Sequence, residues 1–230
     1  MTLPETSPRT APADRYVRAR ATFLAGAAHG ELTGDHAALG GRIDAWTKPF
    51  EGLDVLFLLS GRVERFGIDY YVQGTDGRIS LLRLQERWTT ATAGAGFVVS
   101  TLLPEEVTTS FPLTVNAKLG ISLNHFVNLG FRSNVAGLWL AMDGAYQVVP
   151  RVKIEAGGYA TVGVNGDRGS LSVAGVPAHL GGWHGVLVVE VVPSLGLEVV
   201  GGYEGEVVAL RGTQRLFNRF VLGAGGVLPF

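Results

Sequence analysis

Charged residues are sparse in this chain of 230 residues, at 17 %, and many of them fall on one face of segments in which polar and apolar residues alternate. In a typical soluble domain about a quarter of the residues are charged. Charges of both signs on one face could line a narrow passage for small polar solutes. They could equally pair with each other and fill the space between facing segments. The residues predicted to share this inward-facing side are Arg18, Arg20, Arg42, Asp44, Asp69, Arg83, Arg87, Lys118, Arg132, Asp143, Lys153, Glu155, Glu198 and Glu204.

The chain offers little for catalysis or metal binding. Cys is absent, and no two of the five His residues have the spacing of metal ligands on one helix or strand. The run Phe131-Arg-Ser-Asn134 resembles the His-x-Ser-Asn motif of the lipid A 3-O-deacylases. Phe occupies the position of the base, however, so Ser133 has no activating group within the motif. We therefore expect no enzyme activity, no cofactor and no metal site.

Segments of alternating polarity are predicted to position the charged side chains. The clearest runs from Leu113 to Asn124, where apolar residues at odd positions alternate with polar or small residues at even positions. In a β-strand these two sets lie on opposite faces. The mean hydropathy is +0.25, yet no stretch of about 18 apolar residues is present to form a transmembrane helix. Hydrophobicity spread over every second residue is typical of a β-barrel in a membrane.

The connections between these segments predict the number of strands. Thr75-Asp-Gly77 is the signal of a tight hairpin, and a further short turn is expected near Asn134. Longer connections are expected at one end, near 30–36, 104–112, 165–182 and 210–215. Short turns are expected at the other end, near 48–52, 91–94, 124–126, 150 and 193. The count is twelve strands, with ten as the alternative. The barrel would cover residues 15–230, after a flexible lead-in over residues 1–14 that is rich in Pro and Thr.

The chain closes on a strand-like stretch, Phe220–Phe230, that ends on an aromatic residue. Read back from the end, every second residue is apolar or small, which places these residues on one face. This closing stretch resembles the C-terminal signature of Gram-negative outer-membrane β-barrel proteins, in which a terminal Phe with alternating apolar residues is read by the barrel-assembly machinery. The resemblance implies that this machinery is a partner of the chain. The residues that would carry the assembly signal are Phe220, Leu222, Leu228 and Phe230.

Together the patterns predict an all-β protein, a single antiparallel up-and-down transmembrane β-barrel embedded in the lipid bilayer of the bacterial outer membrane. The expected function is a small passive pore for small polar solutes or a structural component of the envelope. The alternative is a soluble β-barrel or sandwich that binds a small apolar ligand, because such folds alternate in the same way with the faces exchanged.

Two further features bear on location and partners. A net charge of −1 disfavours nucleic acid as a partner. The first residues lack the apolar segment of a signal peptide, so export implies a leader that is absent from this numbering.

Overall fold

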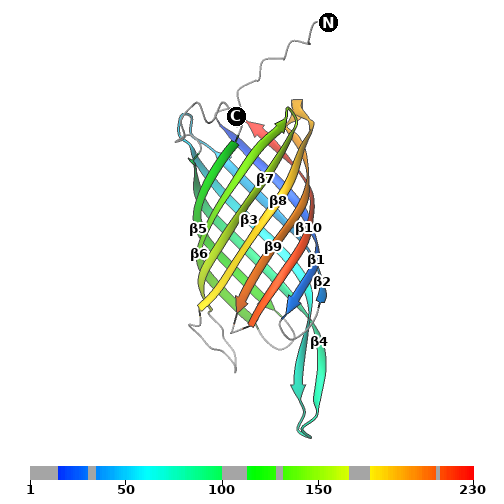
Figure 1. The fold of residues 1–230 in the computed structure, drawn as a ribbon. Helices are drawn as coiled ribbons and strands as arrows, with labels where there is room; N and C mark the ends of the chain where they lie inside the picture. Colours follow the sequence, from blue (N-terminus) through cyan, green and yellow to red (C-terminus); the bar gives the residue numbers. More distant parts are fainter. Residues whose placement is uncertain (1–14, 31–34, 100–112, 128–131, 166–176, 211–212) are drawn as a thin grey trace, which may run out of the picture.

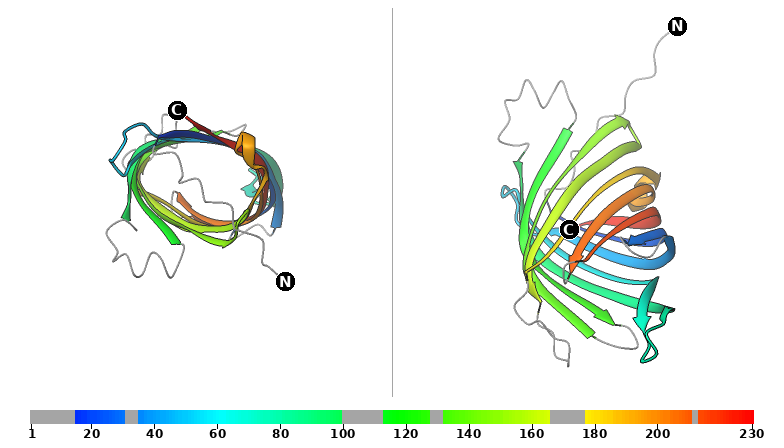
Figure 2. Two further views of the ribbon diagram at one scale, coloured as in Figure 1. Left: turned by 90° about the horizontal axis from the view of Figure 1, so that it is seen from above. Right: turned by 60° about the horizontal axis from the view of Figure 1, so that its bottom comes forward.

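The computed structural model is a closed barrel of ten antiparallel strands (Figure 1). It describes residues 15–30, 35–99, 113–127, 132–165, 177–210 and 213–230. Each strand pairs with its neighbours in sequence, and β1 pairs with β10, so the strands close into a ring around one lumen (Figure 2). The strands are β1 (Tyr16–Gly30), β2 (Asp35–Lys48), β3 (Val55–Gln73), β4 (Ile79–Val98), β5 (Leu113–Val127), β6 (Arg132–Val149), β7 (Val152–Asn165), β8 (Pro177–Val192), β9 (Leu197–Leu210) and β10 (Thr213–Pro229). A 3-10 turn, η2 (Pro193–Leu195), joins β8 to β9.

The outer face of the barrel is apolar and the inner face carries the charges. Large outward side chains such as Ile43, Leu59 and Phe220 are 66 %, 63 % and 70 % exposed. Inward residues such as Glu64 and Arg219 are fully buried. A soluble barrel has the opposite arrangement, whereas a barrel in a bilayer needs an apolar exterior and satisfies its backbone hydrogen bonds between strands. The fold is therefore that of a transmembrane β-barrel, and the soluble alternative does not fit it.

The strand count is ten, the alternative of the two predicted numbers, because two expected turns lie inside strands. Residues 91–94 continue β4, where Gly94 lies opposite Gly120 of β5. A Cβ atom at Gly94 would lie 2.6 Å from the carbonyl oxygen of Leu119, so this small residue serves close strand approach and not a turn. Residues 124–126 likewise continue β5, which runs to Val127, and the next strand, β6, begins at Arg132.

The two ends of the barrel differ from the predicted arrangement in one connection. β4 ends and β5 begins at the end that holds both chain termini, so the connection that includes 104–112 belongs with the short turns at 49–54, 150–151 and 193–196. It was expected at the opposite end. The error follows from the turn wrongly placed at 91–94, which reversed the direction of the next strand.

One hairpin extends beyond the rim opposite the termini (Figure 1). β2 pairs with β3 only as far as Phe66, and β5 pairs with β4 only from Arg87. Within the part of the chain that the structure describes, residues 67–86 therefore form a two-stranded ribbon whose strands pair only with each other. Its turn is the predicted tight hairpin, with Gly77 at a φ of 77°. The predicted lead-in, residues 1–14, lies outside the described residues.

Among the residues that the structure describes, no helix has the length and apolar character needed to cross a membrane.

Candidate functional site: the barrel lumen

A cluster of ion pairs crosses the lumen near the end that holds the termini. Arg18 and Arg20 of β1 both reach Glu155 of β7 and Glu198 of β9. The Arg18 Nη2 atom lies 2.9 Å from Glu155 Oε1 and 2.7 Å from Glu198 Oε2. Arg20 Nη1 and Nη2 lie 2.9 Å from the same two carboxylates, and Lys153 Nζ lies 3.1 Å from Glu155. Because β1 and β7 are separated by β10, β9 and β8, these contacts tie distant strands together across the interior.

A second cluster of ion pairs lies deeper in the barrel. Arg219 of β10 forms a bidentate pair with Glu64 of β3, with N–O distances of 2.6 and 2.7 Å. Its Nη1 atom also lies 2.9 Å from Glu206 of β9. Arg62 of β3 donates to both oxygens of Glu206, at 2.8 and 3.1 Å, and Tyr159 donates to the same carboxylate. All four ionised side chains are buried, so each charge depends on the others for compensation.

Further ion pairs lie on other parts of the lumen wall. Arg42 of β2 donates to Glu204 of β9 at 2.7 Å and to Asp44 at 2.9 Å. On the opposite wall, Lys118 Nζ lies 2.5 Å from Asp143. The charged groups of the lumen are thus largely paired with each other.

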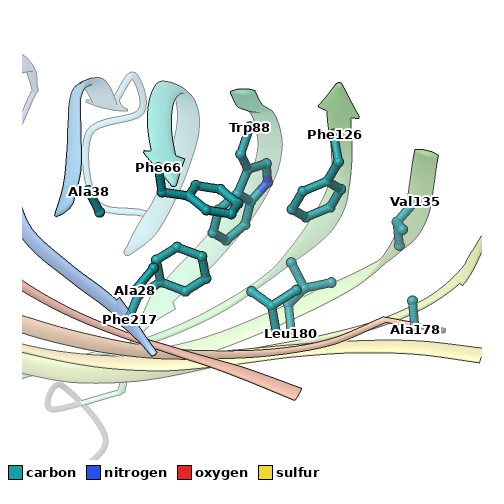
Figure 3. Packing of buried hydrophobic residues seen from close by; sticks show 10 residues of the cluster. Ala28, Ala38, Phe66, Trp88, Phe126, Val135, Ala178, Leu180 and Phe217 are labelled. Atoms are coloured by element: carbon teal, nitrogen blue, oxygen red, sulfur yellow. The ribbon is translucent and has the colours of Figure 1, made fainter. Parts of the chain in front are cut away.

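An aromatic plug lies in the half of the lumen that faces away from the termini, and its side chains point toward one another (Figure 3). We use this name for Phe66, Trp88, Phe126 and Phe217, which come from β3, β4, β5 and β10 and are each at most 2 % exposed. Trp88 stacks on Phe126 with ring centroids 5.0 Å apart, and Phe66 meets Phe217 edge-on at 5.0 Å. Small and aliphatic side chains, among them Ala38, Val135 and Leu180, fill the space around the rings.

The aromatic plug is joined directly to the deeper ion pairs. The Arg62 guanidinium lies 3.8 Å from the centre of the Trp88 ring, and the Arg219 guanidinium lies 4.5 Å from the centre of Phe217. Trp88 Nε1 donates to Asn124 at 3.1 Å, so its one polar atom is satisfied. Rings and cations therefore form one continuous packed layer across the barrel.

The remaining lumen is a cavity of about 1710 Å³. Its walls run from Tyr16 and Lys48, near the end that holds the termini, as far as Arg62 and Glu206. None of the four rings of the aromatic plug, and neither Arg219 nor Glu64, belongs to its lining. The lumen is thus hollow in one half and packed with side chains in the other.

Most of the residues predicted to face inward line this cavity. They are Arg18, Arg20, Arg42, Asp44, Lys118, Asp143, Lys153, Glu155, Glu198 and Glu204.

Three predicted inward residues lie instead on the outside. Arg83, Arg87 and Arg132 are exposed. Glu86 and Trp88, on either side of Arg87, and Ser133, next to Arg132, are buried in the interior, whereas Arg83 lies in the ribbon beyond the barrel. Arg83 and Arg87 were predicted to face inward on the rule that charged residues face the lumen and apolar residues face outward. The aromatic plug reverses that rule, because its large apolar side chains face the lumen. Asp69 lies opposite Arg83 in the ribbon beyond the barrel, and its side chain is outside the described part of the structure.

The charged residues at the centre of the packed layer were missing from the prediction. They are Arg62, Glu64, Glu206 and Arg219, together with the pair Arg215–Glu86, whose N–O distance is 2.8 Å. For Arg219 a signal existed. It continues the face of Val221 and Gly223, opposite the outward Phe220, so extending that alternation by one step places it in the lumen.

The described residues show no group of three or more His, Asp or Glu side chains placed to hold a metal ion. Ser133 faces the interior and is fully buried.

Comparison with solved structures agrees with this architecture. The chain superimposes on the outer membrane protease OmpT from Escherichia coli with a TM-score of 0.53 and 11 % sequence identity, covering 97 % of this chain and all of that one. It superimposes on an outer membrane channel from Pseudomonas putida F1 with a TM-score of 0.50 and 9 % sequence identity, covering 97 % of this chain and all of that one. No protein-family model matches the chain, and no curated protein sequence matches it.

The closed barrel and its apolar exterior define the class of the chain: it is a transmembrane β-barrel with the fold of outer-membrane β-barrel proteins. At such low identity the comparisons carry the fold and not the activity, and the two structures, a protease and a channel, differ in activity on a shared architecture.

Proposed function

We propose that this protein is a non-conducting outer-membrane barrel with a structural role in the envelope, and that it has no enzymatic activity. The observation that carries the proposal is the packed layer in the lumen. Arg62, Arg219 and the rings of the aromatic plug are buried between β3 and β10, and neither Arg219 nor any of the four rings lines the cavity. A barrel filled in this way blocks solute passage and links its own strands across the interior.

The energy of the packed layer supports a closed resting state. In the wild-type protein, where the rings stay packed, one way to open a passage is to move both Arg62 and Arg219 away from their carboxylates. Removing one partner from a buried pair costs about 3–5 kcal/mol. Two pairs at the lower value cost about 6 kcal/mol, so about one molecule in twenty-five thousand is open by this route. The stacking of Trp88 on Phe126 adds to this cost.

Liposome swelling tests the proposal. The protein is reconstituted into phospholipid vesicles, and the vesicles are then placed in iso-osmotic solutions of a small sugar or an amino acid. A closed barrel gives the same swelling rate as empty vesicles. A rate that rises with the amount of protein and falls with the size of the solute contradicts the proposal.

A small passive pore for polar solutes is the second candidate. The cavity favours it, because charged groups of both signs line a path through half of the barrel. In this reading the packed layer is a gate made of side chains, and swelling appears under conditions that displace it.

We also propose that the outward face of β10 is the assembly signal read by the barrel-assembly machinery. Phe220, Leu222, Leu228 and Phe230 are 58–70 % exposed on the outer face of the strand that closes the barrel against β1. More than half of the surface of each of these side chains is exposed, so their apolar character suits the surroundings of the strand, either lipid or an assembly factor.

A further inference from the structure

Three exposed arginines lie on the outer face of the barrel near the rim opposite the termini. Arg65 of β3, Arg87 of β4 and Arg132 of β6 are all exposed. Their outward direction follows from their neighbours, since Glu64, Glu86 and Ser133 point into the lumen and are at most 1 % exposed. We refer to these three residues as the arginine row.

The arginine row is continuous across neighbouring strands. Arg65 lies directly opposite Arg87 in the β3–β4 pair. Arg87 lies opposite Val127 of β5, and Val127 lies opposite Arg132. Strands in a sheet are about 4.8 Å apart, so the backbones of Arg87 and Arg132 are about 10 Å apart.

The arrangement leaves positive charge without compensation. Like charges directly opposite each other destabilise a strand pair. Within the described part of the chain, none of the three arginines forms an ion pair with a carboxylate, whereas nearly every arginine in the lumen has one. An anion from the surroundings would remove the repulsion between Arg65 and Arg87 and complete their hydrogen bonds.

The position of the arginine row identifies those surroundings. Along β3 toward this rim, the outward residues before Arg65 are Phe57, Leu59 and Val63. Along β6 toward the same rim, the outward residues Leu140 and Leu138 come before Arg132. Each arginine is thus the first outward charge beyond the apolar belt on its strand, at the level where hydrocarbon gives way to lipid headgroups.

We propose that this rim faces outward, because the long ribbon extends from it and such barrels carry their longer connections on the extracellular side, and that the arginine row binds phosphate groups of lipids in the outer leaflet. A guanidinium matches a phosphate through paired, charge-assisted hydrogen bonds. The row faces sideways from the barrel and continues directly from the apolar belt, so a ligand there has its acyl chains on Val63 and Leu138 while its phosphate meets the arginines. A lipid that carries two phosphates has charge for both the Arg65–Arg87 pair and Arg132.

Titration with lipid A tests the proposal on the full chain in an uncharged detergent. Lipid A with both phosphates, dephosphorylated lipid A and inorganic phosphate are titrated separately, and bound lipid is counted by native mass spectrometry. The wild type is compared with Arg65→Gln/Arg87→Gln/Arg132→Gln and with the control Arg78→Gln at the exposed tip of the ribbon. Gel mobility before and after boiling verifies that each variant is a folded barrel.

We expect the triple variant to bind phosphorylated lipid A about a hundredfold more weakly, or roughly fivefold for each arginine. Arg78→Gln should change the affinity by less than about twofold, and dephosphorylated lipid A should bind the wild type as weakly as phosphorylated lipid A binds the triple variant. Equal affinity of wild type and folded triple variant overturns the proposal. Equal affinity of the wild type for the two forms of lipid A also overturns it. If inorganic phosphate binds as tightly as the lipid, the assignment of the site to a lipid is wrong.

Discussion

Replacing Arg219 with Met is predicted to destabilise the barrel through the carboxylate that it leaves behind. Arg219 donates two hydrogen bonds to Glu64, and both side chains are fully buried. Among the described residues, no other side chain donates a hydrogen bond to Glu64. Glu206 also loses a contact, but it keeps Arg62 and Tyr159. The penalty therefore falls mainly on Glu64.

The size of the effect follows from the loss of both hydrogen bonds to a fully buried carboxylate. Removing one partner of a buried pair costs about 3–5 kcal/mol. Met fills much of the volume of the arginine stem, so a cavity adds little to the loss. The double variant Arg219→Met/Glu64→Gln carries no uncompensated charge at this point. We expect it to recover at least about 2 kcal/mol of the free energy of unfolding relative to the single variant.

Urea unfolding of the protein in phospholipid vesicles measures these differences. Tryptophan fluorescence reports the transition, because Trp88 packs against the same arginine, with the guanidinium 5.8 Å from its ring. Arg78→Met is the matched control, since its side chain is 88 % exposed in the ribbon, and it should leave the midpoint unchanged. A loss below about 1 kcal/mol for Arg219→Met, or a double variant no more stable than the single one, would refute the reasoning.

Three further predictions concern the wall, the ribbon and the last strand. Gly94→Val should lower the free energy of unfolding in urea by about 1–3 kcal/mol, because its Cβ would meet the backbone of β5. Gly61→Val is the control and should cost far less, since there is open space around its Cβ; equal losses contradict this prediction. Replacing residues 68–85 with a two-residue turn should leave the boiled and unboiled gel mobilities distinct, because that ribbon pairs with neither β2 nor β5, and loss of the unboiled band argues otherwise. Deleting Phe230 should lower the amount of folded protein in cell envelopes without changing refolding in detergent; unchanged amounts in cells dismiss the proposed signal.

The alternation of residue types predicts most of the barrel, because in a bilayer every strand needs apolar side chains on its outer face and can carry polar side chains on its inner face. Along β5 the even positions from Thr114 to Asn124 face the lumen and the odd positions from Leu113 to Leu123 face outward, as expected from the sequence. The same rule placed Arg18, Glu155 and Glu198 on inward-facing positions, where they meet across the cavity.

The rule fails where the lumen itself is apolar. Phe66, Trp88, Phe126 and Phe217 are large hydrophobic residues that face inward, so an alternation read as polar inside and apolar outside reverses there. Which strands lie opposite one another depends on the number of strands, and two misplaced turns changed that number. The pairing of Arg219 with Glu64, separated by 155 residues, follows only from the closed ring.

Single-channel recording in a planar bilayer tests the closed lumen most directly. The wild type is compared with Trp88→Ala/Phe217→Ala, which removes two rings from the aromatic plug while leaving all charged residues in place. The account predicts a flat baseline for the wild type and discrete conductance steps for the variant. Regular steps from the wild-type protein, with the same amplitude as those of the variant, would show that the packed layer does not close the barrel.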